Sequence, residues 1–105
     1  MALPELHVTL QELHYLVVVA DEQHFERAAE LCHVSQSTLS AQLKKLEDQL
    51  DVMLFDRSQR QATPTPVGRE IIAQARLVLE EARKIQAIAL RGLDPMQGVL
   101  RVGVI

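Results

Sequence analysis

The fold of this chain is decided by residues 25–50, FERAAELCHVSQSTLSAQLKKLEDQL. The first eight carry apolar residues at helical spacing, and Ala28 and Ala29 are small enough to let another helix pack closely. His-Val then makes a turn, and Ser35 is a favourable N-cap for a second helix that runs to about Leu50. Leucines spaced four, three and four residues apart predict one buried stripe on it, namely Leu39, Leu43, Leu46 and Leu50. The pattern is typical of a helix-turn-helix.

The second helix carries short polar side chains near its start, on the side opposite the leucines. In a helix-turn-helix the first helix braces the second, and the N-terminal residues of the second contact base edges in the DNA major groove. Glutamine can pair with adenine through two hydrogen bonds, hydroxyls can bond to several bases, and a helix N-terminus favours phosphate. The same residues also suit a capped, solvated helix start, but the adjoining helix and the strands that follow favour DNA contact. The predicted contacts are Ser35, Gln36, Ser37, Thr38 and Ser40.

Two further segments complete a winged helix-turn-helix. Thr9 and Glu12 form a capping-box pattern, and apolar residues at helical spacing follow, which predicts a helix over 10–22. After the central pair, residues 52–56 and 61–65 are short strand candidates joined by Arg-Ser-Gln-Arg. Two short strands after a three-helix unit predict a wing, which is a hairpin beside the second helix of the motif.

A long helix is predicted over residues 66–91. Thr65 and Pro66 are a strong helix start, with threonine as N-cap and proline in the first turn, and Gly92 is a stop signal. Apolar residues then alternate spacings of four and three, which is a heptad seam. Further apolar residues widen the stripe beyond what a lone exposed helix tolerates, so the helix needs a partner, and a second copy of itself fits best. The predicted dimerisation residues are Ile71, Ala75, Val78, Ala82, Ile85 and Ala89.

The last segment, residues 92–105, differs in character from the helix before it. A linker with Pro95 leads into VLRVGVI at 99–105, which has the composition of a buried strand. A lone strand is not stable, so we expect it to be the first strand of an α/β domain that this chain lacks. The sequence therefore predicts three parts: a winged helix-turn-helix over 1–65, a linker helix over 66–91, and a hinge with that strand over 92–105.

Composition limits the classes of function. The chain has 105 residues, enough for one small domain, and it is 48% hydrophobic but only 3% aromatic, as in helical proteins. No apolar run reaches the ~18 residues that cross a bilayer. The one cysteine, Cys32, fits a reducing cytoplasm and is expected to be a small buried hydrophobe. The four histidines lack ligand spacing, and no phosphate loop or catalytic triad pattern occurs, so we expect no metal, no cofactor and no enzymatic activity.

The net charge of −3 is unusual for a protein that binds DNA. Residues 1–34 hold six acidic residues and one arginine, a net charge of −5, so the remainder of the chain has a net charge of +2. A surface that faces phosphate can therefore still be positive, although charge alone should not bind DNA tightly.

The stretch AAELCHVSQSTLSAQLKKLEDQL, followed by LFDR and by TPVG at 65–68, resembles the LysR-type transcriptional regulators. The resemblance covers about residues 13–105, and HFERAAELCHVSQSTLS is most similar to the peroxide-sensing OxyR branch. It implies a winged helix-turn-helix and a linker helix that pairs two protomers. It also implies a C-terminal domain that senses an effector ligand or a redox signal, and a tetramer at full length.

The resemblance also assigns roles by position. Arg60 matches the wing arginine that enters the minor groove, and Arg57 and Lys45 match positions near phosphate. Lys44 and Lys45 can contact phosphate or be solvated. Base and phosphate contacts are assigned to Gln36, Ser37, Thr38 and Ser40.

Three positions depart from the family pattern. Ser37 stands where proline is common, Ala41 stands where relatives often have a long polar residue, and Asp51 replaces a frequent glycine. Aspartate adopts the left-handed conformation less easily than glycine, so the end of the second helix is expected to be less favourable.

The sequence therefore predicts a mainly α protein, a winged helix-turn-helix followed by a long dimerisation helix. The predicted function is a cytoplasmic, homodimeric transcription regulator that binds a pseudo-palindromic DNA site. The alternative is a helical dimerisation or scaffold module whose helix-turn-helix binds protein. The heptad seam fits both functions, whereas the polar helix start and Arg60 fit only DNA binding.

Overall fold

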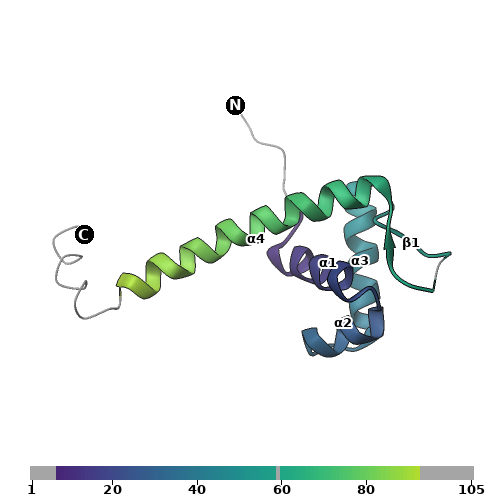
Figure 1. Ribbon diagram of the computed structural model, residues 1–105, viewed down its shortest axis with the longest axis horizontal. Helices are drawn as coiled ribbons and strands as arrows, with labels where there is room; N and C mark the ends of the chain where they lie inside the picture. The colour runs from purple at the N-terminus through teal and green to yellow at the C-terminus, as the bar shows by residue number, and fades with distance from the viewer. Residues whose placement is uncertain (1–6, 59, 93–105) are drawn as a thin grey trace.

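The computed structural model describes residues 7–58 and 60–92, and in this part of the chain it shows four helices and a two-stranded sheet (Figure 1). The elements are α1 (Leu10–Glu22), α2 (Phe25–Cys32), α3 (Gln36–Leu50), β1 (Phe55–Asp56), β2 (Thr63–Pro64) and α4 (Pro66–Gly92). The predicted class, a mainly α winged helix-turn-helix with a long terminal helix, is confirmed. The strand predicted at 99–105 lies outside the described residues.

Side-chain caps explain where α1 and α3 begin, and left-handed residues explain where the first three helices end. The Thr9 hydroxyl accepts a hydrogen bond from the Glu12 backbone N–H at 3.1 Å, and the Glu12 carboxylate accepts one from the Thr9 backbone N–H at 2.9 Å. This pair satisfies two amides that have no partner within a helix. At their C-terminal ends, α1, α2 and α3 are closed by residues in the left-handed conformation, namely Gln23, His33 and Asp51.

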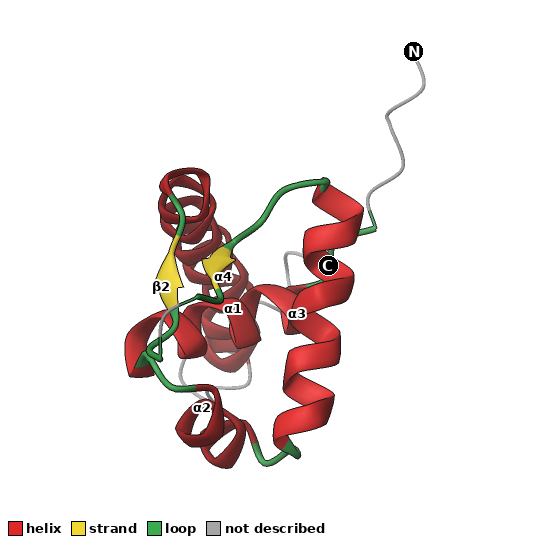
Figure 2. Ribbon diagram, turned by 90° about the vertical axis from the view of Figure 1, so that its right-hand side faces the viewer, coloured by secondary structure: helices red, strands yellow, loops and turns green. Residues whose placement is uncertain are grey.

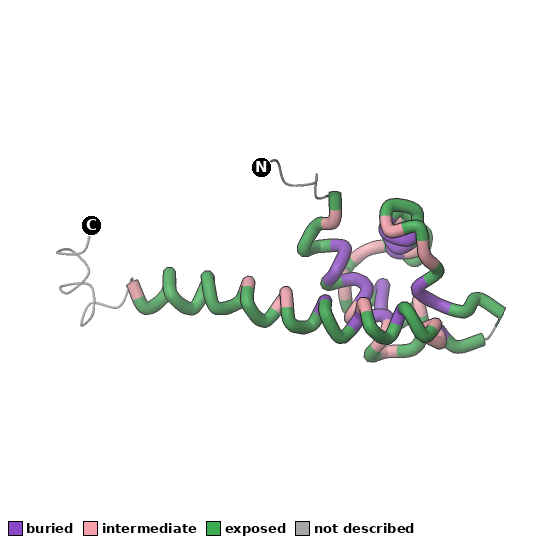
Figure 3. The backbone as a smooth tube through the Cα atoms, turned by 90° about the horizontal axis from the view of Figure 1, so that it is seen from above, coloured by how far each residue is buried: buried purple, intermediate pink, exposed green. Residues whose placement is uncertain are grey.

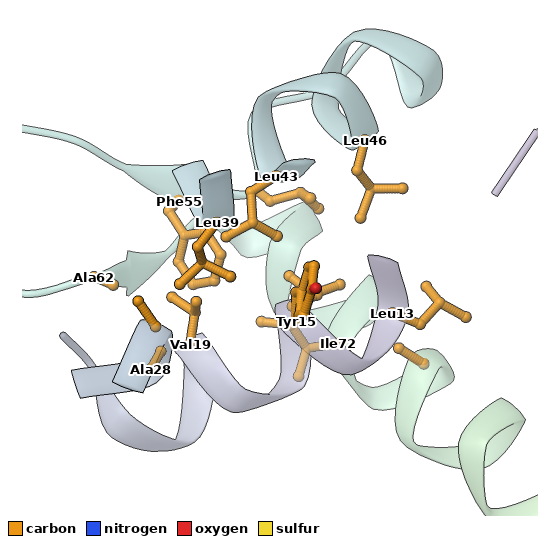
Figure 4. Close-up of a cluster of buried hydrophobic side chains, with 14 residues drawn as sticks. Leu13, Tyr15, Val19, Ala28, Leu39, Leu43, Leu46, Phe55, Ala62 and Ile72 are labelled. Carbon is orange, nitrogen blue, oxygen red and sulfur yellow. The ribbon is translucent and has the colours of Figure 1, made fainter. Parts of the chain in front are cut away.

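The core forms around α1, which packs against α2, α3 and α4 (Figure 2). Leu16 and Val19 of α1 are fully buried and belong to one core cluster. Val19 lies there with Phe55 of β1 and Ile72 of α4 (Figure 4). The predicted leucine stripe of α3 supplies three more fully buried side chains, Leu39, Leu43 and Leu46. Burial of each such side chain stabilises the fold by about 1.5–3 kcal/mol. The stripe therefore holds the second helix of the motif firmly on α1.

The wing consists of β1, β2 and the residues 57–62 between them. Its antiparallel register pairs Phe55 with Pro64 and Asp56 with Thr63. Each strand has two residues and is shorter than the predicted segments 52–56 and 61–65. The Leu54 and Phe55 amides donate to the Glu47 carboxylate of α3 at 2.7 and 3.4 Å, and Pro64 has no N–H to donate. The predicted strands are thus correct in position and wrong in length.

α4 begins beside the wing, packs along α1 and then extends beyond the domain (Figure 1). The Thr65 hydroxyl caps its first turn by accepting the Gly68 N–H at 3.0 Å. An ion pair of 2.7 Å between Arg76 and Asp21 ties α4 to α1. Past that point the helix is mostly exposed, as Figure 3 shows. Among the described residues, no helix is long and apolar enough to cross a membrane.

Candidate nucleic-acid interface

The helix-turn-helix is braced as the sequence predicts. Ala28 and Ala29 are buried where α2 meets its neighbours, at 0% and 3% exposure. The turn is closed by a hydrogen bond from the Val34 N–H to the Ala29 carbonyl at 3.1 Å. His33 in that turn has φ 59° and ψ 40°, which reverses the chain direction within one residue. α3 is therefore held rigidly on α2 and α1, with its outer face free.

Ser35 acts as the N-cap of α3. Its hydroxyl accepts the Thr38 backbone N–H at 3.1 Å and donates to the Thr38 hydroxyl at 2.8 Å. It also lies 3.2 Å from the hydroxyl of Ser37. These three bonds occupy the Ser35 hydroxyl within the chain and order the first turn of α3.

The first turn of α3 presents the polar groups that the sequence predicts. Gln36, Ser37 and Thr38 are all exposed, whereas Ser40 is half-buried at the edge of the leucine stripe. In the described part of the chain, the backbone amides of Gln36 and Ser37 have no acceptor. Serine at position 37 adds one of these amides, because proline would have none. Free amides at a helix N-terminus favour an anion such as phosphate.

The middle of α3 offers positive charge and open space. Lys44 and Lys45 are exposed and border a hollow beside Ala41. The small side chain of Ala41 leaves that hollow unfilled. A long polar residue at this position would reach across it.

The two wing arginines differ in environment. Arg57 donates to the buried carboxylate of Glu47 at 3.0 Å, and its guanidinium lies 5.5 Å from the ring centroid of Phe25. Arg60 is exposed, and over residues 7–58 and 60–92 its guanidinium makes no hydrogen bond or ion pair. The structure therefore keeps Arg60 available for a ligand and engages Arg57 within the chain.

One more contact attaches the wing to the domain, and two bonds order the wing internally. The Ala62 N–H donates to the Gln23 carbonyl, in the turn between α1 and α2, at 2.8 Å. The Ser58 hydroxyl and backbone N–H both donate to Asp56 Oδ1, at 2.6 and 2.9 Å, and these bonds lower the pKa of the Asp56 carboxyl. Asp56 therefore stays ionised and orders the start of the loop that leads to Arg60.

The predicted dimerisation seam is divided in two by the fold. Ala75 is 2% exposed and is taken up by the core of its own domain, against which Ile71 and Val78 also pack. Ala82 is half-buried, whereas Ile85 and Ala89 are exposed. Ile85, Ile88 and Leu90 are respectively 70%, 59% and 68% exposed. The second half of α4 is therefore the part that presents apolar surface.

Cys32 lies at the end of α2 and is half-buried, with its thiol free. Burial raises its pKa, so the thiol remains protonated at neutral pH. Within the described ranges, no three histidine, cysteine, aspartate or glutamate side chains lie together as a metal site would require.

Residues 10–69 match the sequence profile of the family described as "Bacterial regulatory helix-turn-helix protein, lysR family". The chain belongs to the LysR family. The match runs from α1 to the first turn of α4 and includes the complete helix-turn-helix and the wing. The resemblance stated from the sequence is therefore confirmed, and the chain carries a LysR-type DNA-binding domain.

LysR-family relatives of this chain include peroxide-response regulators. The "DNA-binding transcriptional dual regulator OxyR" of Escherichia coli (strain K12) is 44% identical over 98 residues, which is 93% of this chain. The "Hydrogen peroxide-inducible genes activator" of Pectobacterium carotovorum subsp. carotovorum has the same identity over the same length. The chain spans 32% of the length of each of these relatives.

Solved structures of LysR-type proteins share the fold. Full-length OxyR from Pseudomonas aeruginosa, a variant with one substitution, is 57% identical with a TM-score of 0.79, over 82% of this chain and 29% of that one. The BenM DNA-binding domain in complex with benA site 1 DNA is 30% identical with a TM-score of 0.79, over 84% of this chain and 99% of that one. This fold has thus been solved on DNA.

Two residues of the site were missed by the sequence reasoning. Glu47 falls next to the leucine stripe of α3 and is buried at 6% exposure, and Phe25 stacks under Arg57. A carboxylate adjoining an apolar stripe is a signal that it has buried partners. The partners of Glu47 lie seven to ten residues further along the chain, outside α3, and could not be read from spacing. The roles given to Arg57, Arg60 and the polar turn of α3 remain predictions.

Proposed function

We propose that the protein is a sequence-specific transcription regulator of the LysR type that binds a pseudo-palindromic DNA site as a homodimer. The observation that carries this proposal is the polar first turn of α3. Gln36, Ser37 and Thr38 are exposed, together with two backbone amides that have no acceptor among the described residues, on a helix whose other face buries three leucines completely. Such a helix is suited to lie in a major groove with its start against the bases.

The wing supports the same proposal. Arg60 is exposed in the loop of a short hairpin and has no partner among the described residues, which suits insertion into a narrow minor groove beside the recognition helix. Because the net charge of the chain is −3, one such domain should hold DNA weakly. Two domains joined through α4 would place two recognition helices in successive major grooves about 34 Å apart.

The proposal extends to the protein as a whole. The chain would comprise a winged helix-turn-helix over 1–65, a linker helix over 66–91, and over 92–105 the hinge and first strand of an effector domain. That domain would sense a ligand or a redox signal and would support a tetramer. The protein would act in the cytoplasm as a regulator, without enzymatic activity of its own, as expected for its family.

The test is selection of DNA from a random pool by the 105-residue chain, read by sequencing. We expect an enriched pseudo-palindrome. Gln36→Ala should lower affinity for that sequence by ~1–3 kcal/mol and relax the preference at one base pair in each half-site. Gln49→Ala, at the other end of the same helix and also exposed, is the matched control and should change neither. A pool without enrichment would favour the scaffold function instead.

A further inference from the structure

A buried carboxylate joins the recognition helix to the wing. Glu47 lies in the C-terminal half of α3 and is 6% exposed. Its Oε2 accepts the Leu54 N–H at 2.7 Å and the Phe55 N–H at 3.4 Å. Its Oε1 accepts a hydrogen bond from the Arg57 guanidinium at 3.0 Å. One side chain of α3 therefore binds β1 and the residues on both sides of it.

Aromatic contacts extend this connection to α2. The Arg57 guanidinium lies 5.5 Å from the ring centroid of Phe25, the first residue of α2. Phe25 also packs edge-to-face against Phe55, with ring centroids 5.9 Å apart. Cation–π and edge-to-face contacts both favour specific orientations of the groups involved. We call Phe25, Glu47, Phe55 and Arg57 the wing anchor, because together they join α2, α3 and β1.

The wing depends on this anchor for its direction. Its strands have two residues each, and a two-stranded hairpin has little stability of its own. Just before β2, a hydrogen bond from the Ala62 N–H to the Gln23 carbonyl holds the wing to the turn after α1. At the start of β1, the bonds to Glu47 set the angle at which the chain leaves α3. The position of Arg60 relative to the first turn of α3 follows from that angle.

We propose that Glu47 and Arg57 are positioning residues for DNA binding. They fix the wing relative to α3, so that Arg60 and the first turn of α3 reach the same duplex together. This inference rests on the proposed DNA-binding function. Arg57 acts through the wing and not on phosphate, because its charge is neutralised by Glu47 and its side chain is only 38% exposed.

The direction in which DNA affinity changes when Glu47 is neutralised distinguishes a positioning role of this residue from an effect of its charge. Glu47 is negative and belongs to the helix that would face DNA, so by charge alone its neutralisation should strengthen binding. Glu47→Gln should weaken binding instead. The amide oxygen can still accept the Leu54 N–H, but the NH2 group then faces the Arg57 guanidinium, donor against donor. Asp48→Asn is the matched control, because it removes an exposed charge on the next residue and leaves the anchor intact.

The experiment measures affinity of the 105-residue chain for the duplex enriched by random-pool selection, by fluorescence anisotropy. Glu47→Gln should lower the affinity about tenfold, because Arg57 loses the partly buried ion pair that holds the wing on α3. Asp48→Asn should leave the affinity equal or raise it about twofold, since an exposed charge is well screened. Arg57→Met keeps the apolar stem over Phe25, should fold because the position is partly exposed, and should bind as weakly as Glu47→Gln.

A double-mutant cycle with Arg60→Ala gives the decisive comparison. If the anchor acts by placing Arg60, Arg57→Met should cost little further affinity once Arg60 is gone. If the double variant instead loses as much affinity as the two single variants together, Arg57 behaves as an independent phosphate contact, and the proposal is overturned. A Glu47→Gln variant that binds as tightly as Asp48→Asn overturns it as well.

A measurement without DNA distinguishes this inference from the proposed function. Residual dipolar couplings of the backbone amides should fit one alignment tensor for α3 and the wing in the wild type. In Glu47→Gln and in Arg57→Met the wing should require a tensor of its own. A single tensor in both variants refutes the anchor, whatever the DNA results. A wild-type chain that enriches no duplex refutes the proposed function, and the tensors then still decide on the anchor.

Discussion

Three residues of the described chain that are not glycine adopt the left-handed conformation, each directly after a helix. Gln23, His33 and Asp51 have φ values of 64°, 59° and 57°. Each reverses the chain so that the next element can fold back on the core, and each donates its backbone N–H to the helix that it closes. An L-residue in this conformation costs roughly 1–2 kcal/mol. The turns of this domain therefore retain strain that glycine would relieve.

Asp51→Gly should stabilise the fold. Glycine adopts the left-handed conformation without a steric penalty, and this gain exceeds its greater entropy in the unfolded chain, so the free energy of unfolding should rise by about 0.5–1 kcal/mol. Urea denaturation followed by circular dichroism measures the change. Asp51→Ala is the control, since it also removes the carboxylate but keeps the strain. An alanine variant as stable as the glycine variant would show that charge, and not conformation, is responsible.

The thiol of Cys32 should be less reactive than its exposure alone suggests. Burial raises its pKa, so at a given pH a smaller fraction is thiolate, which is the form that reacts with iodoacetamide. Alkylation at pH 8 should therefore be slower in the folded chain than in the same chain in urea. The two rates should converge as the pH rises above the folded pKa. Equal rates at pH 8 would contradict a raised pKa.

At the scale of elements, local caps made the helices predictable, and tertiary contacts made the wing harder to predict. The capping box at Thr9 and the N-cap Ser35 lie within a few residues of the helices that they start, so α1 and α3 were predicted at their observed bounds. The strands are shorter than predicted, and β1 is held by the Glu47 carboxylate of α3, which accepts the amides of Leu54 and Phe55. Spacing carries no information on such a contact between two elements.

The junction between the wing and α4 is closely packed. The Gly68 Cα faces the backbone carbonyl of Leu54 and the hydroxyl of Thr65, and a Cβ at this position would overlap the Leu54 oxygen. That oxygen cannot move away easily, because it accepts the Thr65 N–H at 3.0 Å. The glycine of the TPVG sequence is therefore required by close approach and not by an unusual φ.

Gly68→Ala should accordingly destabilise the domain, although alanine is the better helix former. Overlap at a packed site costs typically 1–3 kcal/mol, which exceeds the gain of about 1 kcal/mol in helix propensity. Thermal unfolding measures the loss. Ala73→Gly, at an exposed position of the same helix, calibrates the propensity alone and should cost about 1 kcal/mol. A Gly68→Ala variant more stable than the wild type would show that the junction yields.

At the scale of the whole molecule, the two halves of α4 lie in different environments. Its first half completes the core through Ile72 and Ala75, and the ion pair of Arg76 with Asp21 fixes its direction. Its second half presents Ile85 and Ile88 to solvent. The heptad pattern is continuous, so the sequence could not show that the fold already covers part of the seam. A partner helix would therefore pack chiefly beyond Arg76, on the exposed half.

Ile85→Asp should abolish the proposed dimer without unfolding the domain. The side chain is 70% exposed in the single chain, so a charge there costs little until a partner helix covers it. Ala87→Asp is the matched control, because two residues along a helix lie about 200° apart, which places Ala87 on nearly the opposite face. Light scattering should give twice 11.8 kDa for the wild type and for Ala87→Asp, and 11.8 kDa for Ile85→Asp.

On the selected duplex, Ile85→Asp should also lose cooperative binding of its two half-sites, because each domain then binds with only its own recognition helix and wing. A dimeric Ile85→Asp would place the interface elsewhere on the chain, and dissociation of Ala87→Asp would show that added charge on α4, whatever its face, is enough to separate the protomers.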